Sequence, residues 1–335
     1  MTRSSLSGLA APDPALEREM QARLDEVEAA LEKATRSDTD FVTEVASHLV
    51  MSGGKRFRPL MVLLSGCFGE DRADPRLIQG AVAIELTHVA TLYHDDVIDE
   101  AEVRHGVQSV NARWGNNVAI LSGDFLFARA SEIASDLGAA EVRLLAQTIA
   151  TLCDGVIREV QSWGRVDQTV EAYTEIIRRK TAMLISTSCR LGGLLSDADP
   201  DTVETLTDFG MALGLGFQLS DDLMDLTSSE VELHKTPGQD MHQGMYTLPA
   251  LYTLEDPELG PELRALLAGG PPQGERLDRA VQLVATGPAL TRVREAVMRE
   301  VHRAKQRALS LTPGPAQDAL VNVAEFLAAR CGADA

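Results

Sequence analysis

Apolar residues recur at helical spacing along most of the chain, and the alternating pattern with hairpin turns that marks β-strands is absent. Residues 16–49 have the apolar stripe of an amphipathic helix, and residues 117–136 and 139–162 are also helical in period. Three others are apolar nearly all round, as in helices buried at the centre of a bundle: residues 76–96, 176–195 and 206–225. The pattern therefore predicts an all-α protein.

One domain is predicted, because no stretch rich in Pro, Gly or Ser divides the apolar segments. A loop is expected at residues 267–278, and two or three amphipathic helices follow it. Residues 1–15 look like a disordered tail. We therefore predict a single helical bundle over residues 16–335.

Composition narrows the function classes. The formal net charge of −19 argues against nonspecific binding to nucleic acid. No uninterrupted apolar run is long enough to span a membrane, and the first residues lack the apolar segment of a signal peptide. The four cysteines are scattered, with no Cys-x-x-Cys pair, so they read as reduced thiols. We expect a cytoplasmic protein.

Two acidic motifs of the form DDxxD each end a buried apolar helix. On a helix, positions i and i+4 lie about 40° apart around the axis, so Asp95 and Asp99 share a face and Asp96 points sideways. The second motif, Asp221 to Asp225, repeats this arrangement. Carboxylates grouped in this way repel each other unless a cation lies between them, and oxygen ligands suit magnesium. The alternative is that these acids form a solvated helix end or pair with arginines.

Lysine is rare in this chain, and three of its five lysines lie beside other unusual residues. Lys55 lies in the loop SGGKRFRP, Lys180 begins a buried helix after two arginines, and Lys235 follows the second acidic motif. Lysine and arginine both bind phosphate well. Acids and bases at several helix ends thus predict a magnesium-bridged diphosphate site, although each lysine taken alone could be an ordinary surface residue.

These motifs together resemble the trans-polyprenyl diphosphate synthases, closest in pattern to the long-chain members. The matching pieces follow the family's order: GGKRFRP (53–59), IELTHVATLYHDDVIDEAEVRHG (84–106), KTA (180–182), GFQLSDDLMD (216–225) and KTPGQD (235–240). The resemblance implies a helical bundle around a central cavity, of the isoprenoid synthase type. It also implies a homodimer and a prenyltransferase that joins isopentenyl diphosphate head-to-tail (1'-4) to an allylic diphosphate.

The resemblance also implies residue roles, with three Mg²⁺ ions when substrate is bound. The implied metal ligands are Asp95, Asp99, Asp221 and Asp225. The residues implied in catalysis are Asp95, Asp96, Asp99, Lys180, Asp221 and Asp222. Isopentenyl diphosphate would be held by Lys55, Arg58 and His88, and the allylic diphosphate by Arg104, Lys180 and Lys235. Thr181 and Gln218 match positions that line the reacting carbons.

Three positions depart from the family's usual pattern. His105 stands where the family usually has a second arginine that contacts isopentenyl diphosphate. With an unperturbed pKa of about 6.5, a histidine there is a conditional cation, which a nearby diphosphate should favour in its charged form. His234 replaces a usual glycine, and Met245 stands where lysine is common.

Product length is the last expectation. Small residues, Thr91 and Ala90, stand four and five positions before Asp95, where short-chain relatives carry a bulky aromatic that closes the tunnel. Thr87 follows one turn deeper, so we expect an open tunnel and a product longer than C20. Two alternatives stay open: a class I terpene cyclase or lyase, which would not need Lys55, Arg58 and His88, and a non-catalytic subunit of another synthase.

Overall fold

The computed structural model describes residues 13–227 and 238–331. Its elements up to residue 137 are α1 (Pro14–Ala34), α2 (Asp40–Met51), α3 (Phe57–Gly66), α4 (Arg76–Ile98), β1 (Val103–Arg104), β2 (Val107–Gln108), α5 (Val110–Trp114) and α6 (Asn116–Leu137). Five more follow: α7 (Ala139–Ser162), α8 (Val170–Ile177), the π-helix η1 (Arg178–Ala182), α9 (Met183–Leu195) and α10 (Pro200–Thr227). The last are α12 (Gln239–His242), α13 (Leu248–Glu255), α14 (Gly260–Leu267), α15 (Glu275–Thr286), α16 (Ala289–Leu309) and α17 (Pro315–Arg330).

The all-α prediction is confirmed, since within the described residues the only sheet is the short antiparallel pair β1–β2. The chain divides into two compact units. The first consists of Met1–Ile149, Leu184–Gly210 and Ala308–Asn322, and the second of Ala150–Met183, Met211–Arg307 and Val323–Ala335. A single domain over residues 16–335 stays a prediction. In the described part of the chain, no helix is long and apolar enough to cross a membrane.

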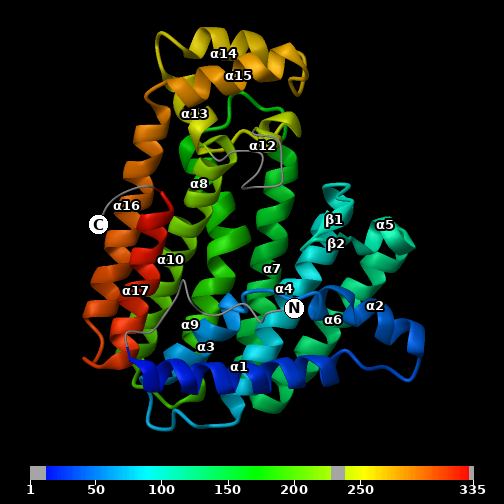
Figure 1. Ribbon diagram of the computed structural model, residues 1–335, viewed down its shortest axis with the longest axis vertical. Helices are drawn as coiled ribbons and strands as arrows, with labels where there is room; N and C mark the ends of the chain where they lie inside the picture. Colours follow the sequence, from blue (N-terminus) through cyan, green and yellow to red (C-terminus); the bar gives the residue numbers. More distant parts are fainter. Residues whose placement is uncertain (1–12, 228–237, 332–335) are drawn as a thin grey trace. The chain divides into compact units, whose positions relative to one another are not determined.

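Helix α4 is the core of the first unit. It packs most extensively against α6 and also contacts α1 and α3, and Figure 1 shows α1 crossing it steeply. Tyr93 of α4 is fully buried, and its hydroxyl donates to the carbonyl of Val45 at 2.7 Å and accepts from the amide of Leu49 at 3.3 Å. These bonds tie α2 to the helix that ends in the first acidic motif.

The second unit holds the segments that surround the second acidic motif. In it α8 runs into η1, and α13, α14 and α15 contact one another, as Figure 1 also shows. A Cβ at Gly155 would lie 2.7 Å from the amide nitrogen of Lys180, and one at Gly214 would lie 2.5 Å from the Cα of Ala182. The two glycines therefore let α7 and α10 approach the backbone of η1, and π-helical turns of this kind are frequent at functional sites.

The observed boundaries differ from the expected ones in two places. Helix α1 begins at Pro14 rather than Leu16, because the Asp13 side chain caps it by accepting from the amides of Ala15 and Leu16 at 2.7 and 2.9 Å. The amphipathic pattern of 16–49 is split into α1 and α2. At the break, the Thr35 hydroxyl donates to the carbonyl of Glu32, and the hydroxyls of Ser37 and Thr43 accept from backbone amides. Residues 1–12 lie outside the described part of the chain.

Candidate active site

The first acidic motif forms the C-terminal end of α4. Asp95 and Asp99 are partly exposed, and the amide of Asp99 donates to the carbonyl of Asp95 at 2.8 Å as the helix ends. Asp96, which lies between them in the sequence, is fully buried. The two flanking carboxylates therefore have access to solvent and to a ligand, whereas the middle one faces the protein.

Arg104 of strand β1 holds the buried carboxylate. Its Nε donates to Asp96 Oδ1 at 2.7 Å, and the buried Asp96 Oδ2 has no hydrogen-bond partner in the described part of the chain. Burial raises the pKa of Asp96, although the charge of Arg104 opposes that rise. The hairpin that carries Arg104 turns through His105 and Gly106, both with positive φ, of 52° and 76°.

Several basic residues lie near this acidic end. The pKa of His88 is well below its usual value because of burial, and the charges of Arg58, His105 and Arg104 lower it further. The pKa of His105 is also lowered, by desolvation and by the charge of Arg104. Lys55 is exposed in the loop before α3. Arg58, Arg104 and His105 of the first unit thus lie within electrostatic reach of His88.

The second acidic motif, near the end of α10, repeats the burial pattern of the first. Asp221 and Asp225 are partly exposed, while Asp222 is buried. Tyr173 of α8 donates its hydroxyl hydrogen bond to Asp222 Oδ2, and Gln218 donates to Asp222 Oδ1 at 3.1 Å. Burial is the largest cause that raises the pKa of Asp222, to about 8.

Two further predicted residues join this network. Thr181 of η1 donates to Gln218 Oε1 at 2.8 Å, so Gln218 links Thr181 to Asp222. Lys180, its neighbour in η1, pairs with Glu159 of α7. The second unit therefore brings Thr181, Gln218 and Asp222 into one hydrogen-bonded chain.

The sequence reading missed two residues around the second motif. One is Tyr173, described above. The other is Arg330 of α17, whose Nη2 donates to Asp221 Oδ1 at 2.9 Å and whose guanidinium lies 5.1 Å from the ring centroid of Phe217. Both are remote from the acids in sequence, so no local pattern points to them. Lys235 and His234 lie outside the described residues.

The described residues fit an oxygen-liganded cation. Each motif offers two partly exposed carboxylates one helical turn apart, and Asp96 Oδ2 is an orphaned acceptor behind the first pair. Within the described residues no three His, Cys, Asp or Glu side chains converge as a complete metal site. Magnesium binds through few carboxylates and takes its other ligands from water and substrate phosphates, so the pair of partly exposed carboxylates in each motif fits it.

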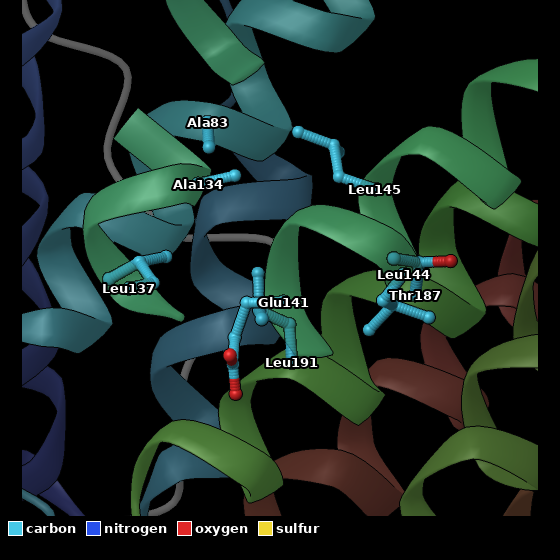
Figure 2. Close-up of a pocket in the computed structure, with 8 residues that line it drawn as sticks. All are labelled: Ala83, Ala134, Leu137, Glu141, Leu144, Leu145, Thr187 and Leu191. Carbon is cyan, nitrogen blue, oxygen red and sulfur yellow. The ribbon is translucent and has the colours of Figure 1, made fainter. Parts of the chain in front are cut away.

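The predicted chain-length residues lie along α4. Thr87 and Ala90 are fully buried, and Thr91 is partly exposed. One turn below Thr87, Ala83 borders a small cavity, with space for about one water molecule. Figure 2 shows its lining, contributed by α4, α6, α7 and α9: Ala83, Ala134, Leu137, Glu141, Leu144, Leu145, Thr187 and Leu191.

Known proteins resemble this chain over nearly its whole length. The nonaprenyl diphosphate synthase of Mycobacterium tuberculosis is 36% identical over 330 residues, which are 98% of each protein. Component 2 of the heptaprenyl diphosphate synthase of Bacillus subtilis is 36% identical and covers 92% of this chain and 88% of its own.

Solved structures of related synthases also resemble this chain. The heptaprenyl diphosphate synthase of Staphylococcus aureus matches with a TM-score of 0.88 at 31% identity, covering 92% of this chain and 98% of its own. The geranylgeranyl pyrophosphate synthase of Corynebacterium glutamicum, solved with calcium and isoprenyl diphosphate, matches with a TM-score of 0.85 at 38% identity, covering 96% and 99%. The Polyprenyl synthetase family model matches residues 39–284. With its all-α isoprenoid-synthase fold, this chain is a prenyltransferase that belongs to the polyprenyl synthetase family.

Proposed function

We propose that this prenyltransferase joins isopentenyl diphosphate to an allylic diphosphate in a magnesium-dependent head-to-tail (1'-4) condensation. The observation that carries the proposal is the pairing, in the first unit, of a partly exposed carboxylate pair with a group of basic residues. Asp95 and Asp99 end α4, while Arg58 and Arg104 lie close enough to His88 for their charges to lower its pKa. Such a site is suited to two diphosphates and a divalent cation.

In this proposal the partly exposed acids hold the metal, and the buried acids position them. Asp95 and Asp99 would hold Mg²⁺ for the allylic diphosphate, and Asp221 and Asp225 would hold a further Mg²⁺, with three ions in all when substrate is bound. The hydrogen bonds from Arg104 to Asp96 and from Tyr173 to Asp222 support a positioning role for these two buried acids. When bound, Mg²⁺ supplies positive charge to the leaving diphosphate.

The basic residues divide between the two substrates. Lys55, Arg58, His88 and, when protonated, His105 hold isopentenyl diphosphate. Arg104, Lys180 and Lys235 hold the allylic diphosphate. Arg104 is already engaged with Asp96, and Lys180 with Glu159, so their side chains are oriented before the substrate arrives.

The chemistry follows from this arrangement. The allylic carbon–oxygen bond breaks, and its electron pair leaves with the diphosphate, whose growing charge the cations stabilise. The double bond of isopentenyl diphosphate then forms the new carbon–carbon bond, and a proton is lost to restore a double bond. Thr181 and Gln218 line the reacting carbons, and apolar walls keep water from the cation.

The product is proposed to be longer than C20. Support comes from the small buried residues Thr87 and Ala90 on α4, and from relatives whose names specify nonaprenyl and heptaprenyl products. From Asp95 to Ala83, α4 rises by about 18 Å. We infer that the growing chain follows this face of α4 and reaches the cavity beside Ala83 (Figure 2).

A homodimer is also proposed, with a cytoplasmic location as predicted from the sequence. Ile120 and Leu121 on α6 are 41% and 67% exposed, which suits an apolar surface covered by a second copy. The name of the Bacillus subtilis relative, component 2, raises the alternative of a different partner chain. Light scattering of the purified chain would separate a dimer from a monomer that needs such a partner, and cell fractionation would test the location.

The decisive experiment is an incubation with labelled isopentenyl diphosphate and, in turn, dimethylallyl, geranyl, farnesyl and geranylgeranyl diphosphates. Mg²⁺ is compared with Ca²⁺ and with a chelator. A ladder of linear prenols beyond C20, seen only with Mg²⁺, is expected. Hydrocarbon made without uptake of label would indicate a terpene cyclase, and no turnover of any substrate by a folded dimer would indicate a non-catalytic subunit.

A further inference from the structure

The loop Gly53–Pro59 presents three cations that look alike in sequence, but one of them points inward. Arg56 is buried, with 6% of its surface exposed, whereas Lys55 is exposed. The Nε of Arg56 donates to Glu28 Oε1 of α1 at 2.6 Å, and its Nη1 donates to Glu85 Oε1 of α4 at 2.9 Å. Its Nη2 also donates to the carbonyl of Val50. The guanidinium thus joins α1, α4 and the end of α2.

The backbone of Arg56 itself has an unusual conformation. Arg56 has φ 46° and ψ 40°, a left-handed conformation that a non-glycine residue holds only where its surroundings enforce it. Its carbonyl accepts from the amide of Leu60 at 2.9 Å and so starts α3. A Cβ at Gly54 would lie 3.2 Å from Arg56 Nη1, so the glycine leaves room for the guanidinium.

The ion pairs lie directly behind the basic group of the candidate site. Glu85 precedes His88 by one turn of α4, so fixing Glu85 to the loop also fixes the loop against the helix that carries His88. The charge of Arg56 is felt at both His88 and His105, and that of Glu85 at His105. The salt bridges of Arg56 are therefore within electrostatic reach of the residues proposed to hold isopentenyl diphosphate.

We propose that Arg56 is a positioning residue: its bonds to Glu28 and Glu85 fix the loop so that Lys55 and Arg58 face the diphosphate of isopentenyl diphosphate together with His88. The inference rests on the proposed function. Arg56 does not touch the substrate. Its planar fork binds two carboxylates and a carbonyl at once, which a lysine ammonium cannot reproduce with the same geometry.

The test compares two variants with a matched control. R56K keeps the charge but loses the fork, and E28Q weakens the more exposed of the two ion pairs, whose glutamate side chain is 40% exposed. The control is R23K: Arg23 of α1 is also buried, and it donates to the backbone carbonyls of Arg72 and Asp74, away from the basic group. Each full-length protein is titrated calorimetrically with isopentenyl diphosphate, and KM is measured for both diphosphates.

We expect R56K to raise the Kd and KM for isopentenyl diphosphate by about tenfold, as small displacements of binding groups do, with KM for the allylic diphosphate unchanged. E28Q should shift the same constants in the same direction by less, and R23K should shift neither. Two results would overturn this inference but leave the proposed function standing. In the first, R56K and E28Q leave the Kd and KM for isopentenyl diphosphate unchanged. In the second, R56K and R23K weaken the binding of both diphosphates equally. A wild-type chain that binds no isopentenyl diphosphate would overturn the proposed function and this inference with it.

Discussion

The hydroxyl of Tyr173 donates a hydrogen bond to Oδ2 of Asp222, the buried middle aspartate of the second acidic motif. The first motif has a counterpart, because Arg104 bonds its buried middle aspartate, Asp96. In both motifs a residue from another element fixes the inner carboxylate and leaves the outer two partly exposed. We therefore expect these bonds to hold the helix end that carries the outer aspartates, much as outer-shell hydrogen bonds orient metal ligands in other proteins.

Replacing Tyr173 with phenylalanine should therefore weaken metal binding. Y173F removes a hydrogen-bond partner from a buried carboxyl group, which costs about 1–3 kcal/mol of unfolding free energy, and we expect the Mg²⁺ requirement to rise by about tenfold. Urea unfolding and the Mg²⁺ dependence of turnover measure the two effects. Y246F is the control, because the Tyr246 hydroxyl is buried and has no hydrogen-bond partner among the described residues. Equal behaviour of the two variants would show that the Tyr173 bond does not position Asp222.

The histidine at position 105 should make substrate affinity depend on pH. Desolvation and Arg104 lower the pKa of His105, so it is neutral at pH 7 in the free protein, and a bound diphosphate would raise that pKa. Binding then takes up a proton, and affinity is highest at low pH and falls as pH rises through the pKa of the bound state. We expect KM for isopentenyl diphosphate to increase between pH 6 and pH 8.

The matched variant for this prediction is H105R, in which the cation is permanent. Its KM for isopentenyl diphosphate should be lower than that of the wild type at pH 8 and should vary less with pH. The titration of the substrate itself affects both proteins equally, so it cancels in the ratio of their KM values. Parallel pH profiles for the two proteins would show that His105 does not contact the diphosphate.

Arg330 pairs with Asp221, a proposed metal ligand, so it should compete with the metal before substrate binds. Removing the positive charge in R330Q should tighten binding of Mn²⁺ to the substrate-free protein by about two- to fivefold, the range of a partly exposed ion pair. Electron paramagnetic resonance of free Mn²⁺ measures this without turnover. R330K retains the charge and should bind Mn²⁺ as the wild type does. Weaker binding in R330Q would mean instead that Arg330 holds Asp221 in place for the metal.

The sequence predicts local features of this protein well and long-range partners poorly. The burial of α4 and the position of its acids follow from periodicity, since Asp95, Asp96 and Asp99 are set apart by helix geometry alone. Tyr173, Arg330 and the glutamate partners of Arg56 are different. Tyr173 lies 49 residues from Asp222, and Arg330 lies 109 residues from Asp221. Glu28 and Glu85 lie 28 and 29 residues from Arg56, and no local pattern encodes such separations. The break between α1 and α2 depends on Ser and Thr hydroxyls that compete with the helix, and hydrophobic spacing does not record them.

Filling the cavity beside Ala83 should shorten the product. If the growing chain follows α4 from Asp95 past Thr87, its end meets the space between Ala83, Leu145 and Thr187 (Figure 2). A83L places a larger side chain in that space, so the prenol ladder should end one or two five-carbon steps earlier than in the wild type. L145A enlarges the space and should extend the ladder by a similar amount.

The control is A81L, because Ala81 is a fully buried alanine of the same helix that does not line the cavity. Overpacking at either alanine costs about 1–3 kcal/mol of stability, so a general loss of packing would affect both variants alike. Only a change in the tunnel would shorten the ladder in A83L and leave it unchanged in A81L. Gel separation of the dephosphorylated products gives the lengths directly. If A83L and L145A both give the wild-type ladder, the chain does not enter this cavity, and the end of the product lies along another face of α4.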